Sequence, residues 1–143
     1  MIRKARMEDV GALAKLACGL WPHHAPAELE AEFAQTMAKE DAAFFMAWDG
    51  AAVGFAQCQL RRDYVEGTQS SPVGYLEGIY VAEAYRNQGT ARALLAACED
   101  WAREQGCREF ASDCELDNTQ SLKFHMSVGF EEANRIICFA KRL

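Results

Sequence analysis

One stretch of the sequence, from Tyr75 to Gly106, limits the folds that are open to this chain. It begins with the apolar run YLEGIYV over residues 75–81, which is typical of a strand, and continues through the polar segment AEAYRNQGTA. Apolar residues then recur at helical spacing from Ala91 to Trp101, and Gly106 ends the pattern. A strand that leads through a short loop into an amphipathic helix is a βα unit, so we expect an α/β chain whose helix covers a sheet.

The segments on either side complete the expected fold. Two helices, a hairpin closed by Asp49-Gly50, and alternating strands and helices are predicted over residues 10–21, 27–40, 43–48, 51–60, 107–114, 119–127 and 136–140. Gly78, inside the central strand, predicts a bulge or a close backbone approach. We therefore expect one domain over residues 1–143, of the α+β type, with a mixed central sheet flanked by helices.

Charge and composition narrow the possible partners. Fifteen Lys and Arg against 21 Asp and Glu give a net charge of -6, which disfavours nucleic acid and suits a cationic small molecule. The six cysteines lie far apart, with no short Cys/His spacing that would predict a metal site. No apolar run approaches the roughly 20 residues that span a bilayer, so we expect a cytoplasmic protein with no membrane partner.

The loop from Tyr85 to Ala91 is the first candidate for a binding site. Where a strand passes through such a loop into a helix, backbone N–H groups at the helix start and the helix dipole together bind phosphate. Arg86 could add a side-chain contact. An ordinary βα turn is the alternative reading, and a lone glycine in a turn would not exclude it.

Two motifs resemble the signatures of the GNAT superfamily of N-acetyltransferases. Arg86, Gly89 and Ala91 fit Arg/Gln-x-x-Gly-x-Gly/Ala, and the later residues Asn118, Ser121, His125, Gly129 and Phe130 resemble Asn-x-x-Ala/Ser-x-x-x-Tyr-x-x-x-Gly-Phe. The resemblance implies a GNAT fold, with acetyl-CoA as co-substrate and no metal. It also implies that the strand ending at Val81 splays from the strand over residues 107–114. The cofactor would contact Ile79, Tyr80, Val81, Arg86, Asn87, Gln88, Gly89, Thr90, Ala91, Asn118 and Ser121.

Further segments resemble a narrower family, the short bacterial aminoglycoside 6'-N-acetyltransferases. They lie at residues 20–22, 62–67, 70–73, 76–79, 107–109 and 111–113. The resemblance implies acetyl transfer from acetyl-CoA directly to the 6'-amine of a cationic aminoglycoside, and hence antibiotic resistance. It also implies a homodimer, and a substrate site formed by Trp21, His24, Tyr64, Glu77 and Asp113.

Each of these five side chains has a physical role, and for Glu77, Trp21 and His24 there is also a plainer alternative. Glu77 could accept a proton from the ammonium through water, or be an ordinary strand-surface carboxylate. Asp113 would offer an anion to a substrate ammonium. Trp21 could form an aromatic wall or pack in the core, His24 could contact hydroxyls or be merely exposed, and Tyr64 could close over the pocket from its loop.

His125 is the main departure from the family pattern, because many relatives have Tyr there as the acid that protonates the leaving thiolate. Either His125 serves as this acid, or solvent or a backbone amide assists the thiolate. Tyr75 is expected to be structural.

Two other functions remain open from sequence. One is a GNAT enzyme that acts on a polyamine, an amino sugar or a protein lysine. The other is an acetyl-CoA-binding module without catalysis.

Overall fold

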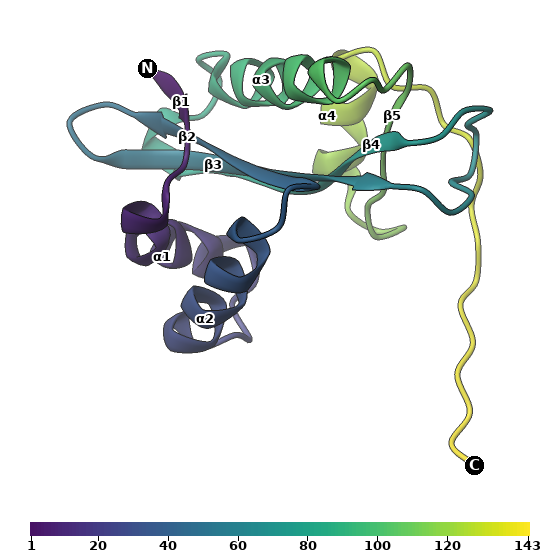
Figure 1. Cartoon of the computed structure of the whole chain (residues 1–143), viewed down its shortest axis with the longest axis horizontal. Helices are drawn as coiled ribbons and strands as arrows, with labels where there is room; N and C mark the ends of the chain where they lie inside the picture. Colours follow the sequence, from purple (N-terminus) through teal and green to yellow (C-terminus); the bar gives the residue numbers. More distant parts are fainter.

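The computed structural model describes all 143 residues and has a five-stranded sheet at its centre, in the order β1-β2-β3-β4-β5 (Figure 1). Neighbouring strands are antiparallel except for β4 and β5, which run parallel. The strands are β1 (Ile2–Lys4), β2 (Ala42–Trp48), β3 (Ala52–Arg61), β4 (Val73–Val81) and β5 (Phe110–Ser112). The mixed sheet predicted from the sequence is confirmed.

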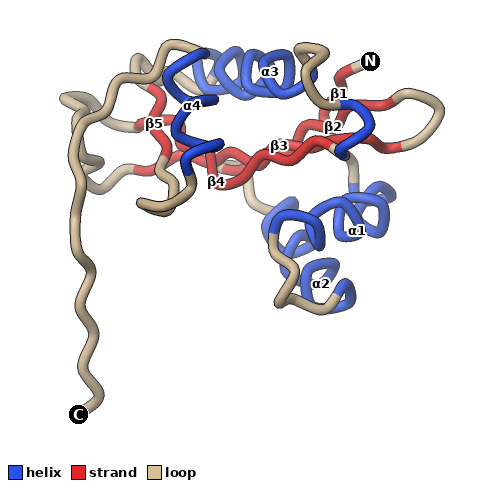
Figure 2. The backbone as a smooth tube through the Cα atoms, turned by 180° about the vertical axis from the view of Figure 1, so that it is seen from behind, coloured by secondary structure: helices blue, strands red, loops and turns tan.

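Helices cover both faces of this sheet. Helices α1 (Val10–Leu20) and α2 (Pro26–Met37) lie on one face, while α3 (Thr90–Glu104) lies on the other and α4 (Thr119–Ser127) is next to β5 (Figures 1 and 2). Short 3-10 turns, η1 (Met7–Asp9) and η2 (Glu83–Tyr85), precede α1 and α3. No helix combines the length and the apolar character needed to cross a membrane.

Each face of the sheet has its own apolar core. On the α1 and α2 side, the rings of Phe33, Phe44 and Phe55 pack together and are almost fully buried. On the α3 side, Leu94 and Cys98 are completely buried against the sheet. The helical periodicity that the sequence shows over both regions therefore corresponds to real buried faces.

The structure differs from the sequence prediction at three strands. The strand β1 was not predicted, because it is only three residues long and two of them are basic. The strand predicted over residues 107–114 is shorter and spans only Phe110–Ser112. The strand predicted over residues 136–140 is wrong for a single chain, since this apolar segment has no neighbour to pair with and lies in an extended, exposed tail.

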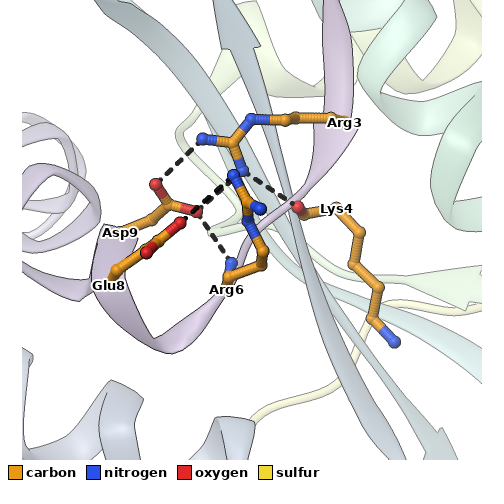
Figure 3. Close-up of polar contacts among 5 residues, drawn as sticks. All are labelled: Arg3, Lys4, Arg6, Glu8 and Asp9. Atoms are coloured by element: carbon orange, nitrogen blue, oxygen red, sulfur yellow. Dashed lines mark hydrogen bonds and ion pairs between the residues drawn. The ribbon is translucent and has the colours of Figure 1, made fainter.

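An ion pair fastens β1 to the start of α1 (Figure 3). The Arg3 guanidinium donates to both carboxylate oxygens of Asp9, at 2.7 and 2.9 Å, and the backbone N–H of Arg6 donates to the same carboxylate at 2.8 Å. Asp9 is only 7% exposed. The hydrogen bond from Arg3, together with the one from Arg6, lowers the pKa of Asp9 from 3.8 to about 2.

We expect Asp9→Asn to lower the free energy of unfolding by about 2 kcal/mol at pH 7, as measured by urea denaturation. Because the folded-state pKa of Asp9 is depressed, its contribution is fully present above pH 3.8 and is lost as the pH falls toward about 2. Glu8→Gln is the control, since Glu8 pairs with Arg6 on the surface, where both side chains are more than 65% exposed. If Asp9→Asn costs no more than this control, the pair does not fasten β1.

Candidate active site

The site begins where β4 and β5 part. The two strands pair only from Gly74 with Phe110 to Leu76 with Ser112, so the rest of β4 has no strand along that side. On the other side of β4, where it pairs with β3, Gln57 pairs with Gly78 while Cys58 pairs with Leu76. Glu77 is therefore left as an extra, bulged residue. The bulge predicted from Gly78 is confirmed, and it re-aims the side chain of Glu77.

A cleft of about 660 Å³ lies beside the free end of β4. Its walls come from that end of β4, from the loop before α3, from the first residues of α3 and from α4. Ten of the eleven residues predicted to contact a cofactor line it: Ile79, Tyr80, Val81, Arg86, Asn87, Gly89, Thr90, Ala91, Asn118 and Ser121. Gln88 does not line the cleft, and its side-chain amide donates to the Ala84 carbonyl at 3.4 Å.

The loop before α3 presents free backbone donors to this cleft. Asn87 and Gly89 both have positive φ, 61° and 81°, and turn the chain tightly into the helix. The N–H of Ala93 donates to the Gly89 carbonyl at 3.0 Å and is the first to be bonded. The N–H groups of residues 90–92 therefore have no backbone partner, which is the arrangement that binds a phosphate group.

The side chain of Arg86 links the loop before α3 to the end of β4. Its Nε donates to the Val81 carbonyl at 2.7 Å, and its guanidinium lies 5.5 Å from the centroid of the Tyr80 ring. These contacts tie the loop to the end of β4. The side chain is otherwise exposed and makes no ion pair, so its remaining N–H groups are available to an anion.

Glu77 is the most enclosed acid of the predicted site. Its side chain is 15% exposed, and one Nη of Arg61 donates to both of its carboxylate oxygens at 2.5 and 2.9 Å. Glu77 is therefore a largely enclosed, ion-paired carboxylate, and its assignment as the base stays a prediction. Arg61 was not predicted from the sequence.

Tyr75 links this ion pair to Asp113. The Arg61 guanidinium stacks on the Tyr75 ring, 3.4 Å from its centroid, and the Tyr75 hydroxyl donates to the Asp113 carboxylate. Burial and the hydrogen bond to Asp113 raise the pKa of Tyr75, so the phenol stays protonated and keeps donating. The four groups form a chain of acid, phenol, cation and acid.

The aromatic and histidine residues predicted for the substrate site have different surroundings. Trp21 packs against Phe33 and Phe55 and lies so close to Gly78 that a Cβ there would be 2.8 Å from its ring. Trp21 therefore lies against Gly78, the residue that follows Glu77 on β4, while contributing to the core. His24 and Tyr64 are exposed and make no side-chain hydrogen bond, Tyr64 being 76% exposed.

His125 has both ring nitrogens engaged. Its Nδ1 lies 2.7 Å from the Ser121 carbonyl, which can only accept, so Nδ1 carries the proton. In the neutral ring, Nε2 then accepts from the Ser112 hydroxyl, also at 2.7 Å. His125 does not line the cleft, and in this arrangement it has no free N–H for a thiolate, so its assignment as the acid stays a prediction.

The contacts that Arg61 and Tyr75 make with Glu77 and Asp113 were not predicted from the sequence. Tyr75 and Glu77 are two positions apart on one strand, and Arg61 is the register partner of Val73 on the next strand. That spacing could have placed the three side chains together. The structure also shows no cluster of three or more His, Cys, Asp or Glu side chains that could hold a metal ion.

This arrangement, with a splayed strand pair, a phosphate-type loop and a cleft between them, defines an acetyltransferase fold. The sequence model of the acetyltransferase (GNAT) family matches residues 10–130, and the chain belongs to that family. The family and the fold expected from the two signatures are therefore confirmed.

Individual proteins of this family are similar to the chain over nearly its whole length. The chain is 48% identical over 140 residues to aminoglycoside N(6')-acetyltransferase type 1 of Stenotrophomonas maltophilia, covering 96% of this chain and 90% of the relative. It is 43% identical over 138 residues to the Serratia marcescens protein of the same name, covering 95% and 94%. The solved structure of AAC(6')-Iy with CoA matches with a TM-score of 0.96 at 40% identity, covering 100% of this chain and 95% of that one.

Proposed function

We propose that this chain transfers the acetyl group of acetyl-CoA to the 6'-amine of aminoglycoside antibiotics, as one catalytic domain over residues 1–143. The observation that carries the proposal is the place of Glu77, which is bulged out of β4 where the strands part, two residues before the cleft-lining Ile79. The named relatives support the choice of acceptor, because a solved structure of AAC(6')-Iy contains a bisubstrate analogue of CoA and acetylneamine.

The residues of the cleft fit a CoA molecule. The unpaired N–H groups of residues 90–92 and the exposed Arg86 would hold its pyrophosphate, and the free edge of β4 from Ile79 to Val81 would pair with the amides of its pantetheine arm. When bound, acetyl-CoA supplies an acetyl thioester.

The acids at the other end of the site would receive the acceptor. Asp113 is exposed and negatively charged, so it attracts a substrate ammonium, while Trp21 offers the sugar ring an aromatic surface. Glu77 accepts a proton from the 6'-ammonium through water, because only the neutral amine has a lone pair to react. Acetylation removes a positive charge from the drug, which weakens its binding to anionic ribosomal RNA and gives the cell resistance.

The test uses neomycin B and paromomycin I, which differ only in carrying an amine or a hydroxyl at position 6'. We expect the purified protein to release CoA thiol rapidly with neomycin and not with paromomycin. Release with both drugs would place the reaction at another amine. Release with spermidine or a histone peptide alone would replace the drug assignment with another amine acceptor, and no release despite CoA binding would indicate a non-catalytic module.

We also propose that two copies form a homodimer through the tail after Phe130. Ala133 lies against Gly67, and beyond it the chain runs away from the sheet with Ile136, Ile137 and Phe139 69%, 80% and 91% exposed (Figure 1). The outer edge of β5 is unpaired, and a hollow of about 510 Å³ lies beside it. An extended apolar segment and an open sheet edge are complementary, so each tail can pair with the other copy.

Light scattering during size-exclusion chromatography tests the dimer. We expect twice the chain mass of 15.9 kDa for the wild type and the single mass for the double variant Ile137→Lys, Phe139→Lys, because charges on these side chains cannot be buried. The matched control changes the exposed surface residues Ala93 and Ala96 to Lys and should stay dimeric. A monomeric wild type, or a dimeric tail variant, would refute the arrangement.

We propose a cytoplasmic location, where acetyl-CoA is available and thiols stay reduced. Cys58, Cys98 and Cys107 are buried and unpaired, and the Cys58 thiol together with burial raises the pKa of Cys98. Cell fractionation should find the protein in the cytoplasmic fraction, and recovery from a secreted fraction would contradict this.

A further inference from the structure

The partner of Glu77 in this structure is a cation from the protein itself. Arg61 donates to both carboxylate oxygens, and no other side chain hydrogen-bonds to Glu77. Glu77 is nearly enclosed, whereas the Arg61 side chain is 41% exposed at the end of β3. Arg61 is thus the more exposed member of the pair, so it is the one that can exchange Glu77 for solvent more easily.

The acceptor ammonium, or the water that carries its proton, needs the same carboxylate. The 6'-ammonium and the Arg61 guanidinium are both cations that donate several hydrogen bonds, and Glu77 has only two oxygens to accept them. Two cations held at one carboxylate would repel each other. The ion pair seen here and the placement of an amine for proton transfer to Glu77 therefore compete.

The Tyr75 ring gives Arg61 a second favourable contact that does not depend on Glu77. A guanidinium over an aromatic face is stabilised by cation–π attraction, and the ring is itself fixed by the hydrogen bond to Asp113. Arg61 can therefore turn its donors away from Glu77 toward solvent while its guanidinium stays on the ring. This makes the release of Glu77 cheaper than the loss of a fully buried ion pair.

We infer that Arg61 is an internal competitor of the acceptor: it occupies Glu77 in the free enzyme and must release it before the 6'-amine can bind productively. The inference rests on the proposed function. Only the fraction of molecules in which Glu77 is released binds the amine well, so the apparent affinity for the acceptor is reduced by that fraction. A 6'-hydroxyl carries no charge and can accept a hydrogen bond from Arg61, so it does not require the release.

The variant Arg61→Met tests this, with Arg62→Met as the matched control. Met keeps an unbranched stem over Tyr75 but cannot pair with Glu77, whereas Arg62 is exposed and makes no ion pair, so its loss removes the same charge from the neighbouring position. Calorimetry on the CoA-bound enzyme should show neomycin binding about tenfold tighter to Arg61→Met than to wild type. Paromomycin binding and neomycin binding to Arg62→Met should change less than threefold.

Kinetics separate this role from one in which Arg61 positions Glu77 during the reaction. We expect Arg61→Met to lower the KM for neomycin with kcat within threefold of wild type, and Arg61→Lys, which keeps a cation, to restore the wild-type KM. A large fall in kcat with unchanged KM would overturn the inference, as would equal gains for neomycin and paromomycin.

A measurement on the wild type needs only one folded variant, which serves to assign a signal. In NMR spectra of the arginine Nε–Hε groups, the signal of Arg61, assigned by its loss in Arg61→Lys, should shift when neomycin is added and not with paromomycin. Neomycin that is bound and acetylated while this signal stays unmoved refutes the inference alone. If neither the wild type nor any variant binds neomycin, the proposed function and this inference are refuted together.

Discussion

Glu77→Gln should lower kcat for 6'-amino aminoglycosides by about 10²–10⁴-fold, the range that a positioned general base contributes. The amide keeps the shape of the side chain and can still accept a hydrogen bond from Arg61, but it cannot take up a proton. The KM for acetyl-CoA should hardly change, since Glu77 does not line the cofactor cleft. Steady-state kinetics with neomycin, with each substrate varied in turn, measure both quantities.

Glu104→Gln is the control for this experiment. Glu104 ends α3 as an exposed residue without an ion pair, so the substitution removes the same charge away from the site. Its kcat should match that of the wild type. If Glu77→Gln also retains kcat within threefold while the protein stays folded, Glu77 is not the base.

Gly89→Val should weaken acetyl-CoA binding by about 100-fold, as measured by calorimetry. The φ of Gly89 is 81°, which a β-branched residue avoids, no protein atom lies within 4 Å of where a Cβ would be, and Gly89 itself lines the cleft. The substitution therefore both distorts the loop and fills the place of a phosphate. Losing one or two charge-assisted hydrogen bonds accounts for this magnitude.

Gly106→Val separates these two effects. Gly106 follows the other end of α3, has a φ of 91°, and also has open space around its missing Cβ. It should therefore bring similar backbone strain and similar loss of stability without touching the cleft. An equal loss of acetyl-CoA affinity in both variants would mean that strain alone is responsible, and the phosphate position at Gly89 would be refuted.

The sequence predicts the parts of this fold that depend on local patterns. The strand over residues 75–81, the loop at Gly89 and the helix that follows are set by apolar periodicity and by positions that require positive φ, both of which can be read from neighbouring residues. The same holds for Asn118, whose side chain caps α4 by accepting from the Ser121 N–H at 3.1 Å. These local features predict the strand, loop and helix, and it is the resemblance to the GNAT superfamily that indicates which of these segments line the cleft.

The contacts that the sequence does not predict depend on pairing between distant segments. The ion pair between Arg61 and Glu77 depends on the register of β3 against β4. It also depends on the bulge in β4, whose position decides where the Glu77 carboxylate points. His125 fits the family signature by spacing, yet its ring is turned toward Ser112 by a hydrogen bond across to β5. The apolar run over residues 136–140 has strand character, but a strand also needs a neighbour, which this chain alone does not supply.

The position of the new acetyl group tests most directly whether this enzyme acetylates the 6'-amine of aminoglycosides. Tandem mass spectrometry and NMR of the product made from kanamycin A and acetyl-CoA would identify the nitrogen that is acetylated. We expect a single monoacetylated product with the acetyl group on the 6'-nitrogen. Acetylation at any other amine, or a mixture of positions, would contradict it.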